Sequence, residues 1–81
     1  MENQLYVIYN KLSNRYEGVF TYPTDAVCRA RIGNPDAKFN FDELEVCKVG
    51  TVDVLSGVIT PSAPVRLEIN PTEKLPVEEA K

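Results

Sequence analysis

The chain has 81 residues, a length that accommodates one small domain and excludes two. With 43% hydrophobic and 26% charged residues, it has the composition of a globular protein rather than a disordered one. Twelve acidic residues outnumber nine basic ones. The resulting net charge of −3 is opposite in sign to that of a typical nucleic-acid-binding protein, which disfavours a protein that coats DNA through general positive charge.

The beginning of the chain predicts a β-hairpin. Residues 5–9 are β-branched and aromatic and form a run too short for a stable helix, so they predict a strand. Turn-forming residues occupy positions 10–14, and β-type residues return over 15–22 until Pro23 ends the run. We therefore expect two strands that pair antiparallel.

A short helix is predicted next. Thr24 and Asp25 provide a helix cap ahead of residues 26–32, and Gly33 is placed to end the helix after about two turns. Breaker residues over 34–42 then predict a loop. The chain should therefore return to the sheet only after position 42.

The second half predicts two more strands. The first covers residues 44–52, where Gly50 is a candidate β-bulge. A hairpin loop over 53–57 leads to a fourth strand that begins at 58–60, is interrupted by two prolines, and resumes over 65–69. We expect this strand to be bent or split. Strict alternation in its last part predicts that Val65, Leu67 and Ile69 face the core.

The order strand, strand, helix, strand, strand predicts an α+β fold, an antiparallel sheet of four to five strands with one short helix. Residues 1–69 form the single domain. Residues 70–81 contain two prolines and five charges and are expected to be a flexible C-terminal tail. One short helix covers one sheet face, so the other is either solvated or a subunit interface. The apolar content favours the interface, and hence a homo-oligomer.

The residue types disfavour catalysis and metal binding. The chain has no histidine, which removes the commonest general base and metal ligand. Cys28 and Cys47 have no further Cys or His to complete a zinc site, and without a signal peptide they are expected to be reduced thiols. Asp42, Glu43 and Glu45 are interpreted as a solvated loop and strand edge rather than a Mg²⁺ site. We expect no enzyme activity, no cofactor, no metal and no membrane span.

The charge is unevenly distributed along the chain. Residues 1–35 hold four basic and three acidic side chains, whereas residues 36–69 hold three basic and six acidic ones. In the less acidic half, the first hairpin carries five aromatic residues, with Lys11 and Arg15 at its loop. Aromatic rings stack on unpaired bases while cations contact phosphate, which is how single-stranded nucleic acid is held without sequence readout.

These considerations select a set of candidate residues for binding nucleic acid. Strand alternation places Tyr16, Phe20 and Tyr22 on one face, so the rings serve either as a stacking platform or as core. On the helix, Asp25 and Arg29 are spaced for an ion pair on the outer side. Helical periodicity puts Arg31 on the apolar side, where it either pairs with an acid of the third strand or reaches a partner. The candidates are Lys11, Arg15, Tyr16, Tyr22 and Arg31.

Several segments also occur in an order that characterises a known family. They are Val7-Ile8-Tyr9-Asn10-Lys11, the Phe20 to Pro23 stretch, Ala30-Arg31, Asn34-Pro35-Asp36, Glu45 to Asp53, and Pro61 to Val65. This pattern, over about residues 5 to 67, resembles the small nonstructural protein of gokushovirus-type microviruses, phages with circular single-stranded DNA genomes. The resemblance implies a protein of the host bacterial cytoplasm that is absent from the virion. It also implies a role in genome replication or in the switch toward single-strand synthesis and packaging.

Two functions are therefore predicted. The first is a non-enzymatic phage protein that binds single-stranded DNA, or acts in a switch toward single-strand synthesis, through the first hairpin. The alternative is a protein-interaction module that binds a host or phage replication protein through its acidic half or its open sheet face, with no nucleic-acid contact. The net charge of −3 favours the alternative.

Overall fold

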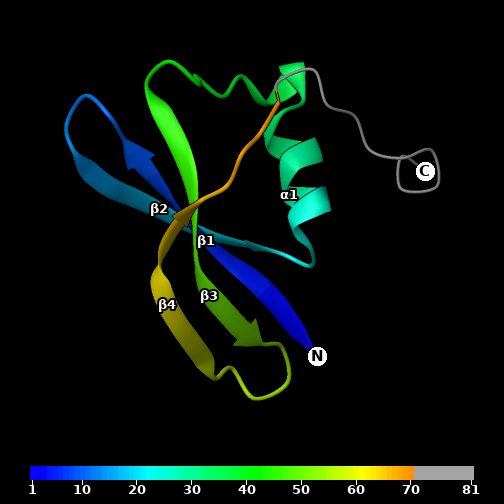
Figure 1. The fold of residues 1–81 in the computed structure, drawn as a ribbon. Helices are drawn as coiled ribbons and strands as arrows, with labels where there is room; N and C mark the ends of the chain where they lie inside the picture. The colour runs from blue at the N-terminus through cyan, green and yellow to red at the C-terminus, as the bar shows by residue number, and fades with distance from the viewer. Residues whose placement is uncertain (71–81) are drawn as a thin grey trace.

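Four segments rich in β-branched and aromatic residues form one antiparallel sheet in the computed structural model, which describes residues 1–70 (Figure 1). The strands are β1 (Glu2–Asn10), β2 (Arg15–Tyr22), β3 (Leu44–Asp53) and β4 (Ile59–Arg66), in the spatial order β2-β1-β3-β4. With one α-helix between β2 and β3, this is the predicted α+β fold. The predicted tail, residues 70–81, lies outside the described residues except for Asn70.

The central position of β1 explains why it is longer than predicted. Residues 5–9 carry its apolar pattern, but the strand runs from Glu2 to Asn10 because every one of these residues pairs with β3. β2 pairs with the other edge of β1 and has the predicted limits of 15 and 22. Backbone pairing on both sides therefore extends the strand into polar positions that local pattern does not mark.

The helix α1 (Asp25–Ile32) begins and ends at the predicted caps. The Thr24 hydroxyl oxygen accepts a hydrogen bond of 3.2 Å from the Val27 backbone N–H, and the Gly33 N–H donates to a carbonyl of the last turn. These bonds satisfy backbone groups that a helix end otherwise leaves unpaired. A 3₁₀ turn, η1 (Pro35–Ala37), follows in the predicted loop.

Two glycines form β-bulges in the sheet. Val7 pairs with Val19 whereas the next residue of β1, Ile8, pairs with Glu17, so Gly18 is an extra residue in β2 with a φ of 68°. The predicted bulge at Gly50 is confirmed, since the register of β3 against both neighbours shifts between Lys48 and Gly50 and leaves Val49 as the extra residue opposite β1. The Gly18 bulge was not predicted, and it interrupts the alternation of faces along β2.

The fourth strand is a single strand with interrupted pairing. β4 pairs with β3 at residues 59–61 and again at 65–66, and the residues between them, which include Pro64, have no partner in the register. Proline is tolerated because β4 is an edge strand. The prediction that Val65 faces the core is wrong, since Val65 is exposed at this edge, where no helix covers it. Leu67 is buried as predicted.

The core lies between α1 and one face of the sheet. Tyr6 and Cys28 are fully buried, and Val46 and Leu67 complete the buried cluster. After β4 the chain leaves the sheet and runs beside α1, which brings Leu67 to this core (Figure 1). Partly buried hydrophobic residues surround the cluster: Phe20, Tyr22, Ile32, Phe39 and Ile69.

The opposite face of the sheet is apolar as well. Residues of β1 alternate between faces, so Val7 points away from the side of Tyr6, and its cross-strand partners Val19 and Cys47 share its face. We call this surface the open face. Its apolar residues are Leu5, Val7, Val19, Cys47, Val52 and Ile59, and the same register places Asn3, Thr21, Glu45 and Arg66 on this side. Within residues 1–70, no helix lies over it.

Candidate functional site

The Gly18 bulge separates the aromatic residues of the first hairpin onto the two faces of the sheet. Phe20 pairs with Tyr6 on the helix side, where their rings stack at 5.4 Å. Tyr16 precedes the bulge and lies on the opposite face. The prediction that Tyr16, Phe20 and Tyr22 share one face is therefore wrong, because the extra residue shifts the alternation by one position. The signal in the sequence was a glycine inside a strand pattern.

A pair of tyrosine rings lies at the hairpin end of the open face. Tyr9 and Tyr16 are cross-strand partners, and their ring centroids are 4.9 Å apart at 51°. The Tyr9 hydroxyl donates a 2.8 Å hydrogen bond to the side-chain carbonyl of Asn14, which holds the Tyr9 ring against the turn. Tyr16 is 56% exposed. The hairpin thus presents one accessible ring that is supported by a second.

Two cations belong to the same turn as this tyrosine pair, although strand alternation directs the Arg15 side chain to the other face. Lys11 and Arg15 stand at the two ends of the turn and are both exposed, and Arg15 is the strand neighbour of Tyr16. The Lys11 ammonium donates to the Phe41 carbonyl at 3.1 Å, so this lysine is held beside the 34–43 loop. Arg15 makes no ion pair among residues 1–70. Three of the five predicted site residues, Lys11, Arg15 and Tyr16, are therefore together at one end of the sheet.

The other two predicted residues lie elsewhere. Tyr22 is six positions from Tyr16 along β2, about 20 Å at the rise of a β-strand, and its ring packs on Tyr6 and Phe20 in the core. Arg31 is exposed on α1, whose buried residues are Cys28 and Ala30, so its predicted place on the apolar side is wrong. The buried side of this helix is set by contacts with distant strands and with the segment after β4.

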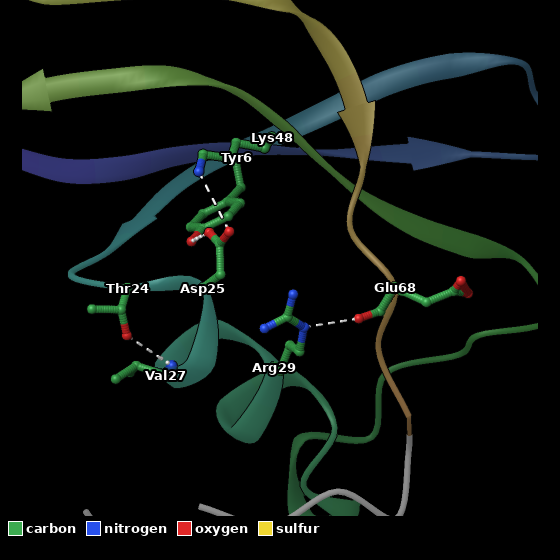
Figure 2. A network of polar contacts seen from close by, with 7 residues as sticks. All are labelled: Tyr6, Thr24, Asp25, Val27, Arg29, Lys48 and Glu68. Atoms are coloured by element: carbon green, nitrogen blue, oxygen red, sulfur yellow. Dashed lines mark hydrogen bonds and ion pairs between the residues drawn. The ribbon is translucent and has the colours of Figure 1, made fainter.

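Asp25 connects the start of α1 to two strands (Figure 2). The Tyr6 hydroxyl donates to one carboxylate oxygen at 2.7 Å, and the Lys48 ammonium lies 3.4 Å from the other. The predicted pair of Asp25 with Arg29 is wrong, because the Arg29 guanidinium instead donates to the Glu68 carbonyl at 3.1 Å. This network holds the helix on the sheet and was missed because its partners are far apart in sequence.

Burial controls the ionisation of the groups beneath the helix. It raises the pKa of the Tyr6 hydroxyl above its ordinary value of 10.0, and the hydrogen bond to Asp25 acts in the same direction. Burial, together with the Asp25 charge, raises the pKa of the Cys28 thiol to about 12. Burial also raises the pKa of the Cys47 thiol, and neither cysteine is in a disulfide. Protonated thiols are poor nucleophiles and poor metal ligands near neutral pH.

The acidic residues around β3 are tied into local contacts. The Asn10 side-chain amide donates to Glu43 at 3.1 Å, and the Arg66 guanidinium lies 3.6 Å from Glu45. Among residues 1–70, no three Cys, Asp or Glu side chains are grouped so that they could hold a metal ion. None of the helices in this range has the length and hydropathy needed to cross a membrane.

Comparison with known proteins identifies no relative. No protein-family model matches the sequence, and neither the curated proteins nor the solved structures contain a match. The resemblance to the gokushovirus nonstructural protein therefore stays a prediction. A binding function is therefore inferred from the geometry of the hairpin end and of the open face.

Proposed function

We propose that this chain is a non-enzymatic phage nonstructural protein that acts in genome replication by binding single-stranded DNA at the end of its first hairpin. One observation supports this most directly. The exposed ring of Tyr16 is backed by Tyr9, and Lys11 and Arg15 are exposed cations at the two ends of the same turn. A ring for base stacking next to cations for phosphate is the arrangement that single-strand binders use.

The free energy of base stacking and the small number of phosphate contacts predict a weak and salt-sensitive site. Stacking of one base on an aromatic ring contributes about 1–3 kcal/mol, and two cations release few counterions. The net charge of −3 opposes the approach of a polyanion. Affinity should therefore be highest at low salt and fall as salt rises, with a slope that reflects about two phosphate contacts.

The proposal is tested by fluorescence polarisation with a labelled single-stranded oligothymidylate across a salt series. Tyr16→Ala should weaken binding by about tenfold or more because it removes the stacking surface, whereas Tyr16→Phe keeps the ring and should retain affinity. Arg15→Gln should weaken binding and flatten the salt slope by about one. Equal affinity of Tyr16→Ala and the unmodified protein would contradict the proposal.

A charge-matched control distinguishes a local site from a general charge effect. Lys38 is an exposed cation in the loop after α1, outside the hairpin itself, and its φ of 55° suits asparagine. Lys38→Asn removes the same single positive charge as Arg15→Gln. If both variants lose affinity equally, binding depends on overall charge and not on the hairpin.

The alternative is a protein-interaction module that binds a host or phage protein without contacting nucleic acid. The apolar open face favours this function, because solvated faces of antiparallel sheets normally carry polar residues. No binding of the oligonucleotide at low salt would eliminate the first proposal and leave this one.

A further inference from the structure

We propose that two copies of this chain form a homodimer by packing their open faces against each other. This inference does not depend on DNA binding. It is centred on the aliphatic residues of the face, and the tyrosine pair of the proposed DNA site lies at the rim, at the hairpin end. The argument rests on exposure, area and charge.

The open face presents aliphatic side chains to solvent. Val19 in β2 is 69% exposed and Ile59 in β4 is 54% exposed, and both lie on the same face as Val7 in β1 and Val52 in β3. Cys47 is nearly buried because it is small and is flanked by its partners Val7 and Arg66. Each of the four strands thus contributes an apolar residue to this face.

The area of this face is sufficient for a dimer. Strands of eight to ten residues rise about 3.3 Å per residue and lie about 4.8 Å apart, so each sheet face covers about 500 Å². With the tyrosine end included, two copies contribute about 1,000 Å², the lower limit of a specific interface, and the relief of the side chains adds to it. Faces of this kind pack about 10 Å apart in β-sandwiches.

The charge on the face fits a second copy of the same chain. Its register places Glu45 and Arg66 on this side, and the two form an ion pair of 3.6 Å with each other. The Arg66 guanidinium also lies 3.6 Å from Glu68, so the charged groups at this edge of the face are paired with one another. A two-fold axis between two such faces places aliphatic side chains, and no unpaired charge, at the centre of the interface.

Sedimentation equilibrium over a concentration series from micromolar to near millimolar tests the proposal. The unmodified full chain should shift from its monomer mass of 9.1 kDa to twice that value. The double variant Val19→Gln/Ile59→Gln places neutral polar groups on the face at two exposed positions, where folding tolerates them. It should raise the dimer dissociation constant by about tenfold or more.

A matched control uses two exposed leucines that lie in turns. Leu12→Gln/Leu55→Gln removes comparable apolar surface from the two hairpin turns, outside the open face, and should leave the dissociation constant unchanged. Circular dichroism of both variants verifies that each is folded. A monomer mass at every concentration, or an equal change in the dissociation constant for the two double variants, overturns the proposal. The face would then be assigned to another occupant, namely residues 71–81 or a different protein.

Discussion

Tyr6 and Cys28 are the two groups whose protonation is most strongly coupled to folding. Both are fully buried beneath α1, and both have a pKa that burial raises above its ordinary value. In the unfolded chain the thiol ionises near 9.0 and the phenol near 10.0. The folded protein therefore holds protons that the unfolded chain loses, so folding favours the protonated forms.

The free energy of unfolding should fall as the pH rises above about 9. Because the folded pKa values are raised, the full stabilisation is present below pH 9, and it is lost as the pH rises toward the folded pKa of Cys28 at about 12. Each such group lowers stability by about 1.4 kcal/mol per pH unit in its window. Urea unfolding at neutral and alkaline pH measures the slope.

Cys28→Ser is the control for this pH dependence. The serine hydroxyl is close in size to the thiol and does not ionise in this range. Between pH 9 and 10 the thiol of the unfolded chain ionises before the phenol does. The variant should therefore lose stability less steeply than the unmodified protein in this interval. Parallel pH profiles for the variant and the unmodified protein would show that Cys28 does not contribute.

At the scale of the elements, two glycines in strands have different structural roles. Gly18 has a φ of 68°, and a Cβ there would meet only the Ile8 side chain at 3.6 Å, an ordinary contact. Gly50 has a φ of 146°, and a Cβ there would overlap the Thr60 carbonyl oxygen of the neighbouring strand. Gly18 thus supplies a backbone conformation, whereas Gly50 also provides space for β4.

Gly50→Ala should therefore destabilise the protein more than Gly18→Ala. Gly18→Ala carries only the cost of a left-handed conformation, about 1 kcal/mol. Gly50→Ala also forces β3 and β4 apart, and we expect it to lower the free energy of unfolding by more than about 2 kcal/mol. Urea unfolding of the two variants compares the losses directly, and a smaller loss for Gly50→Ala would show that β4 shifts without cost.

On the scale of the whole molecule, the helix side of the sheet holds a small core. Six hydrophobic residues are buried in the described part of the chain, and the open face leaves further aliphatic surface in contact with water. Domains of this size bury a smaller fraction of the surface of the unfolded chain than large domains do, and are correspondingly marginal in stability. Covering the open face with a second copy would add a second apolar layer between the two sheets.

Thermal stability should then depend on protein concentration. A ligand that binds only the folded state raises the melting temperature by mass action, and a second copy of the chain is such a ligand. Differential scanning calorimetry of the unmodified chain should give a midpoint that increases with concentration. The midpoint of Val19→Gln/Ile59→Gln should increase less, and concentration-independent midpoints for both proteins would contradict a dimer.

The structures of the hairpin end and of the helix caps were predictable from local sequence. Lys11, Arg15 and Tyr16 are brought together by a turn of four residues, so their proximity needs only hairpin pairing. Tyr22 and Arg31 were grouped with them by residue type and charge. Their positions are decided by packing under the helix and by which side of the helix is buried, and neither property is local.

The sequence by itself determined the four strands, the capped helix and their α+β arrangement, because β-propensity, turn residues and caps act between neighbours in the chain. Tertiary structure alone decided the rest. Asp25 bonds to Tyr6 nineteen positions away, Arg29 bonds to Glu68 thirty-nine positions away, and the bulge at Gly18 turns Tyr16 to the open face. These outcomes depend on register and on contacts between distant segments, which no local pattern encodes.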